Sequence, residues 1–299
     1  MNDGGIKSLM RQGVAIRAAM LRGCSFEEIV GPILDSDSDT RNDADTRNFC
    51  ELLLNIAAVW AYDGFPTVEP GAKLAASFMA TRAEGSDVNG LRLPWHTFGI
   101  RVPKNLLKAI EFAVVFKKPQ HITLLTHSSV INSWEGADYT MEQLASDAPI
   151  APVGIAASNV ERLNHQGMSV EDYYSEFERS HILLKRLVVG VIAEMNSVPA
   201  SSLPSIGNSG PKMKRGEPVS LTYQLTRPVK LDLRENVRSF EDGVRTGPLS
   251  MQFVVRGHWK NQPHGPQRSR RKLIHVEPYW KGPEDAPIAV RAHQLGAGE

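Results

Sequence analysis

The amino-acid sequence predicts an α+β fold, in which N-terminal helices pack on a mixed or antiparallel sheet. Apolar residues recur at helical spacing between residues 6 and 62 and again between 170 and 197. Strand-like alternation of apolar and polar residues appears at 97–102 and at 219–225. A basic stretch with strand character follows near the C-terminus. The helices therefore come first, and the sheet is expected to contain a basic C-terminal β-hairpin.

Composition indicates an ordinary globular protein. The chain has 299 residues, of which 41% are hydrophobic and 22% charged, so it can bury a core without cross-links. Because the formal net charge is only +1, any affinity for a polyanion must come from local clustering of cations. We expect a helical region at 1–90 and an α+β domain at 91–299.

The location of the protein is predicted from its cysteines and its apolar runs. Cys24 and Cys50 are too few to staple a chain of this size and are typical of inert thiols in a reducing compartment. The first residues do not resemble a signal peptide, and charges interrupt every apolar run before about 20 residues. We therefore expect a cytoplasmic protein with no membrane contact.

Three helices are predicted in the N-terminal region, at 6–22, 25–34 and 46–62. Ser25 and Glu28 have the spacing of a capping box at the start of the second helix. The acidic segment 35–46 between the second and third helices begins like a calcium loop. It has threonine where that loop requires glycine and glutamate, so we expect a solvated linker.

The middle of the chain is predicted to form a strand, a helix and a strand. The strand at 97–102 stops at Pro103, Asn105 is expected to cap a helix that runs through Phe116, and a second strand covers 121–126. The long apolar periodicity at 170–197 predicts the central core helix, with Ser169 as its N-cap.

The C-terminal third is predicted to be rich in strands. Segment 198–217 is rich in Pro, Ser and Gly, so we expect a mobile loop there. The elements expected beyond it are strands at 219–225, 229–233, 251–259 and 272–279 and a short helix at 234–242. The last two strands would be joined by a loop too long for a tight hairpin turn.

Catalytic and cofactor motifs are absent from the sequence. There is no G-x-S-x-G, and His127 and Ser128 are adjacent along a predicted strand, where neighbouring side chains point apart. Segment 207–216 lacks the order of a phosphate-binding loop, and no cysteine or histidine pair has zinc-ligand spacing. We expect neither a metal nor a cofactor.

A basic and aromatic segment at 256–281 is the candidate binding site. Cations hold phosphates and aromatic rings stack on bases, so this mixture is typical of nucleic-acid contact. Lys212, Lys214 and Arg215 would assist it. The alternative is an ordinary basic hairpin whose tryptophans pack into the core. The residues predicted to make the contact are Arg256, His258, Trp259, Lys260, Arg268, Arg270, Arg271 and Lys272.

Three stretches resemble a known group of proteins: the segment 94–103 (PWHTFGIRVP), the helix segment 186–192 (RLVVGVI), and R-G-H-W at 256–259 with 271–283 downstream. Their order and spacing are similar to those in an uncharacterised group of phage and mobile-element proteins. That group includes the type V-A anti-CRISPR that blocks biogenesis of its target nuclease. The resemblance covers about the last two-thirds of the chain. It implies a regulatory or counter-defence protein that binds RNA, a ribonucleoprotein or a nascent polypeptide.

Two other functions remain open on the residues alone. Metal-independent RNA cleavage needs an acid, a base and a cation, which His258, His264 and Arg271 could supply. A protein–protein interaction module would instead use the basic hairpin against an acidic partner. The sequence does not predict an oligomeric state.

Overall fold

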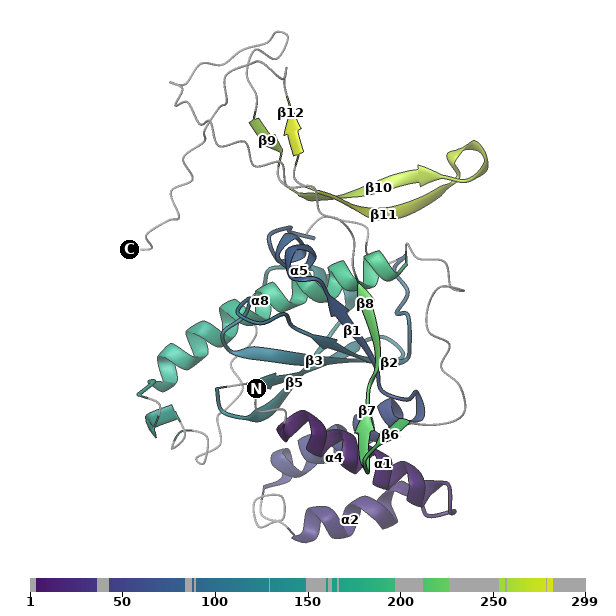
Figure 1. Ribbon diagram of the computed structural model, residues 1–299, viewed down its shortest axis with the longest axis vertical. Coiled ribbons are helices and arrows are strands. Elements are labelled where there is room, and N and C mark those ends of the chain that lie inside the picture. The colour runs from purple at the N-terminus through teal and green to yellow at the C-terminus, as the bar shows by residue number, and fades with distance from the viewer. Residues whose placement is uncertain are drawn as a thin grey trace.

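The computed structural model describes residues 4–36, 43–83, 88, 90–128, 130–148, 160, 163–165, 167–196, 212–225, 253–255, 257–277 and 279–281. It has the α+β fold expected from the sequence, with N-terminal helices, a mixed sheet and a C-terminal antiparallel hairpin (Figure 1). The helices are α1 (Gly4–Met20), α2 (Phe26–Ser36), α4 (Ala44–Tyr62), α5 (Ala72–Met79), α6 (Met141–Ala145) and α8 (Val170–Met195).

The main sheet has six strands in the order β5-β4-β3-β2-β1-β8. Four consecutive antiparallel strands form one side, and β1 and β8 are added in parallel on the other. The strands are β1 (Pro66–Pro70), β2 (Thr97–Arg101), β3 (Ile110–Lys117), β4 (Ile122–Ser128), β5 (Ser133–Tyr139) and β8 (Leu221–Leu225).

Helices cover both faces of this sheet. Phe112 and Val114 of β3 pack with α1 and α4 through Ile6, Ile56 and Trp60. The alternate residues of β3 face the larger core formed with α5 and α8. The outer helix α2 packs against α1 and α4 through a smaller cluster that contains Ile16, Val30, Leu34, Leu54 and Ala58.

Local end signals correctly predicted the starts of α2 and α8. Ser25 Oγ accepts from Glu28 N at 3.2 Å while the Glu28 carboxylate accepts from Ser25 N at 2.8 Å, which is the expected capping box. Ser169 Oγ accepts from Asp172 N at 3.0 Å at the start of α8. Each of these signals involves two residues that are three positions apart, so the hydrogen bonds do not depend on the tertiary structure.

The predicted helix from Asn105 to Phe116 is wrong. Residues 103–109 form turns, and β3 follows as a strand between β2 and β4. Because both faces of β3 are covered by helices, its apolar residues run almost without interruption and do not alternate. A short continuous apolar run fits a buried strand as well as a helix, and β-branched and aromatic residues here favour the strand.

The helical region expected at 1–90 contains a strand in addition to the three predicted helices. Strand β1 lies inside the sheet between β2 and β8, and α5 follows it directly. Its sequence, Pro-Thr-Val-Glu-Pro, is short and has proline at both ends, so it lacks the pattern of a central strand. Residues 66–79 therefore belong to the same core as the rest of the sheet.

Segment 198–217 was expected to be one loop. Residues 198–211 lie outside the described residues, but 212–219 form a small hairpin of β6 (Lys212–Lys214) and β7 (Glu217–Val219). An ion pair of 2.8 Å between Arg11 of α1 and Glu217 attaches this hairpin to the N-terminal helices. The strand predicted at 229–233 and the helix at 234–242 also lie outside the described residues.

The predicted C-terminal strands are each divided in two. Strand β9 (Phe253–Val255) pairs with β12 (Tyr279–Lys281), while β10 (His258–His264) pairs with β11 (Arg270–Val276). The pair β10–β11 projects from the body of the molecule beyond α5 and α8 (Figure 1). The connecting turn is shorter than predicted, because residues 260–264 and 270–271 continue the strands.

Candidate nucleic-acid interface

The register of the C-terminal hairpin sorts its side chains onto two faces. Residues opposite one another in β10 and β11 share a face, and successive residues alternate between faces. One face contains the pairs Trp259/His275, Asn261/Leu273 and Pro263/Arg271. The other contains His258/Val276, Lys260/Ile274, Gln262/Lys272 and His264/Arg270. We call these the docking face and the cationic face.

The docking face attaches the hairpin to the body. The Trp259 ring stacks on Phe78 of α5, with 5.9 Å between centroids and planes 23° apart. His275 is buried, and its Nε2 lies 3.0 Å from Thr81 Oγ1. Leu273 is buried in the main core. Three neighbouring side chains of one face thus fix the foot of the hairpin on α5 and the turn that follows it.

The cationic face points away from these contacts. Lys260 and Arg270 are exposed and Lys272 is half-buried, and side chains two residues apart along a strand are separated by about 7 Å. Among the residues that the structure describes, none of these three cations has an ion pair or a hydrogen bond from its side chain. No acidic residue occurs in the sequence between Gly257 and Val276, so β10, β11 and the turn between them contain no carboxylate that could neutralise these cations.

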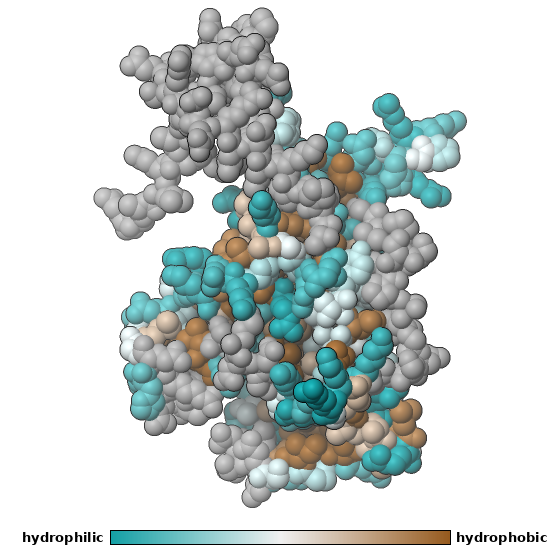
Figure 2. All heavy atoms as spheres, in the orientation of Figure 1, coloured by the Kyte–Doolittle hydropathy of each residue, from teal (hydrophilic) through white to brown (hydrophobic). Residues whose placement is uncertain are grey.

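Cations surround the distal end of the hairpin. Every residue from His264 to Arg271 is exposed. Arg270 lies on the cationic face, Arg271 on the opposite face, and Arg268 in the turn at the tip. The turn places Gly265, Gln267 and Arg268 at positive φ, and only the first of these residues tolerates that conformation freely. Figure 2 shows hydrophilic side chains extending in several directions from this end.

The structure brings most of the predicted contact residues into one element but assigns Trp259 a different place. Its ring belongs to the docking face and is stacked on Phe78. This position agrees with the alternative considered for the sequence, a basic hairpin whose tryptophan packs against the core. Arg256 lies outside the described residues. Lys212, Lys214 and Arg215 belong to the β6–β7 hairpin beside α1, at the end of the molecule remote from β10–β11 (Figure 1). They therefore do not extend the hairpin surface.

The strand geometry separates the three residues of the ribonuclease alternative. His258 and His264 stand at the two ends of β10, six residues apart, which is about 20 Å along a strand. Arg271 lies on the other face of the ribbon from both histidines. An acid, a base and a cation must meet at one phosphorus atom, and this arrangement does not bring them together.

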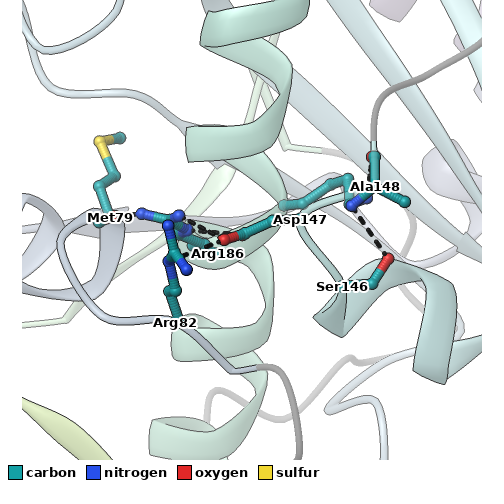
Figure 3. A network of polar contacts seen from close by, with 7 residues as sticks. Met79, Arg82, Ser146, Asp147, Ala148 and Arg186 are labelled. Atoms are coloured by element: carbon teal, nitrogen blue, oxygen red, sulfur yellow. Dashed lines mark hydrogen bonds and ion pairs between the residues drawn. The ribbon is translucent and has the colours of Figure 1, made fainter. Parts of the chain in front are cut away.

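A second polar cluster lies between α5, α6 and α8 (Figure 3). Arg186 donates from Nε and Nη2 to the two Asp147 oxygens at 2.8 and 2.6 Å, and from Nη1 to the Met79 carbonyl at 2.9 Å. Arg82 Nε reaches the same carboxylate at 3.1 Å. The Arg186 hydrogen bond, followed by the charges of the neighbouring cations, holds the pKa of Asp147 below its ordinary value, although partial burial opposes this.

Two buried basic groups adjoin this cluster. Lys185 is 2% exposed and donates to the Ala148 carbonyl at 3.1 Å, and burial lowers its pKa. His181 lies 2.9 Å from the Tyr139 hydroxyl through Nε2, and burial, with a smaller effect of Lys185, lowers its pKa to about 3. The cluster joins elements of the core and offers no accessible reactive group.

Residues 127 and 128 do not form a nucleophilic pair. Both are buried in β4, His127 Nδ1 lies 3.0 Å from Glu111 Oε1, and Ser128 Oγ accepts from Ile131 N at 3.4 Å. A hollow of about 310 Å³ near Tyr173 is lined by both cations and carboxylates and does not present one charge to a ligand. Within the described ranges, no cluster of three metal-ligating side chains is present.

Comparison with known proteins gives no relative from which a function could be transferred. No family model matches the chain, and neither a curated protein nor a solved structure matches it. None of the helices that the structure describes has the length and apolar character needed to cross a membrane. The function is therefore argued from the hairpin itself.

Proposed function

We propose that the protein binds nucleic acid through the phosphate backbone, with the β10–β11 hairpin as its contact element. The observation that supports this proposal is a projecting ribbon with five cations and no acidic residue between 257 and 276. In a chain of net charge +1, this segment concentrates positive charge at one end of the molecule. Such a ribbon attracts a polyanion, and binding is favoured because the cations of the ribbon release counterions that were condensed on the polyanion.

The contact is expected to use charge more than base stacking. The tryptophan of the hairpin is stacked on Phe78. Phosphate contacts determine affinity and position, whereas sequence is read through base edges. The hairpin is therefore expected to bind with a strong dependence on salt and a weak dependence on sequence. The counter-defence role implied by the resemblance remains a prediction.

The test compares two variants with the same change in net charge. Lys260→Gln, Arg270→Gln and Lys272→Gln together remove three charges from the cationic face. The control removes three charges from other exposed lysines, Lys7, Lys73 and Lys104. Dissociation constants for a mixed-sequence nucleic acid would be measured at several salt concentrations by fluorescence anisotropy.

We expect the hairpin variant to bind at least tenfold more weakly at 0.1 M salt and to lose about one unit of the log–log salt slope for each phosphate contact removed. The control should bind like the wild-type protein. Equal losses in both variants would mean that net charge alone determines binding. Absence of binding by the wild-type protein, together with a specific protein recovered from cell extract, would favour the protein–protein alternative.

A further inference from the structure

The distribution of charge along the hairpin indicates which form of nucleic acid it fits. Near its foot, cations occupy only the cationic face, because the docking face is covered by α5. Toward its tip, cations occupy both faces and the turn, through Arg270, Arg271 and Arg268. A single strand lying along the ribbon would need cations on one face only. A ribbon entering a groove meets a phosphate backbone on each side.

We propose, on the basis of the nucleic-acid binding proposed above, that the ligand is duplex DNA and that the tip of the hairpin enters the major groove. That groove is about 12 Å wide and 8.5 Å deep and admits a two-stranded ribbon. Its depth corresponds to between two and three residues of a strand at about 3.4 Å each. The turn and the outermost pairs, His264/Arg270 and Pro263/Arg271, are therefore long enough to reach its floor.

The exposure of the hairpin agrees with such an insertion. Residues 264–271 are exposed without interruption, so none of the body that the structure describes covers the tip. The residues behind them are fixed by Leu273 and His275, which are buried, and by Trp259 on Phe78. A rigid foot with a free, charged tip keeps the ribbon in one orientation while the tip contacts the groove.

Two other forms of nucleic acid fit this geometry less well. Single strands are held largely by bases stacked on exposed aromatic rings, and the indole of the hairpin is engaged by Phe78. The bases of a duplex are already stacked and need no such platform. The major groove of an RNA duplex is deep and narrow, so a two-stranded ribbon does not enter it.

The experiment measures the binding of the full chain to three probes of one sequence: a 20-bp DNA duplex, its single strand and the RNA duplex. Two single variants distinguish entry of the tip into a groove from binding of a single strand along the ribbon. They are Arg271→Gln at the tip and Lys260→Gln near the foot. Both remove one positive charge from the same hairpin. All measurements use 0.1 M salt and are repeated across a salt series.

We expect the DNA duplex to bind at least tenfold more tightly than either other probe. Arg271→Gln should weaken this binding about eightfold, which is 0.1 raised to the power −0.9 for one lost phosphate contact, and Lys260→Gln should weaken it by a smaller factor. Tighter binding of the single strand, with sensitivity at Lys260 and none at Arg271, would overturn groove entry and leave nucleic-acid binding intact. Preference for the RNA duplex would also overturn it. Failure to bind any of the three probes would overturn both proposals.

Discussion

At the scale of single residues, burial of a titratable side chain makes the free energy of unfolding depend on pH. His181 is 2% exposed and lies among Tyr139, Phe177 and Lys185. Burial, and then the charge of Lys185, lowers its pKa to about 3 in the folded protein, whereas a histidine in an unfolded chain titrates near 6.5. The unfolded state therefore binds a proton between these two pH values that the folded state does not.

This difference predicts acid sensitivity that a single substitution should reduce. The contribution of His181 to stability is complete above pH 6.5 and is lost as the pH falls toward 3, so it should cost about 3 kcal/mol between pH 7 and pH 4. His181→Gln retains a polar group for Tyr139 and does not titrate. Urea unfolding across this range should show a smaller decline for the variant than for the wild-type protein. Parallel curves would show that His181 is not the group responsible.

Residue-scale signals were also the most predictable from sequence. The capping pairs Ser25/Glu28 and Ser169/Asp172 were identified because their partners are three residues apart. The network of Arg186 with Asp147 and Met79 joins residues 39 and 107 positions apart, so no spacing in the sequence indicates it. A local pattern shows local contacts, while the partners of a buried charge depend on the tertiary structure.

At the scale of elements, Arg186 in the interior of α8 joins this helix to the end of α5 and to the segment that follows α6. Its guanidinium binds the carboxylate that follows α6 and the last carbonyl of α5, and its side chain is 15% exposed. Arg82 contacts the same carboxylate, but its side chain is 73% exposed. Charge-assisted hydrogen bonds that are shielded from water contribute far more than exposed ion pairs.

Two substitutions at this carboxylate should therefore differ in effect. Arg186→Met should lower the free energy of unfolding by about 2 to 3 kcal/mol, because a half-buried carboxylate loses its bidentate donor and a helix carbonyl loses its partner. Arg82→Met should change it by less than about 0.5 kcal/mol. Chemical denaturation at pH 7 checks both. Equal effects would mean that Asp147 is held by net charge and not by the bidentate geometry.

The strand β3 and the direction of the Trp259 ring could not be predicted from the sequence, and the two cases have related causes. The residues of β3 were predicted as a helix because helices cover both of its faces, and this removes the alternation that identifies a strand. The basic and aromatic residues of the hairpin were identified from sequence, but their faces depend on strand register. A shift of one residue would exchange the docking and cationic faces. The pairing Trp259/His275 places these two side chains on one face, and the stacking of the indole on Phe78 shows that this face points toward α5.

At the scale of the whole molecule, the body and the hairpin tip have separate roles. The core clusters contain residues from the helices and the main sheet, while the hairpin contributes Leu273 and Trp259 from its foot. Residues 264–271 are exposed and no core cluster includes them. Folding of the body is therefore expected to be independent of the part of the chain that is proposed to contact nucleic acid.

Shortening the hairpin tests this separation. Gln262 and Lys272 are directly opposite, so a two-residue Asn-Gly turn between them can replace residues 263–271 without changing the register of the foot. The shortened protein should unfold within about 1 kcal/mol of the wild-type protein in urea, because the deleted residues are almost all exposed. It should also bind the DNA duplex at least a hundredfold more weakly, since Arg268, Arg270 and Arg271 are lost together. A folded, shortened protein that still binds would locate the contact surface elsewhere, whereas a large loss of stability would show that the tip takes part in the core.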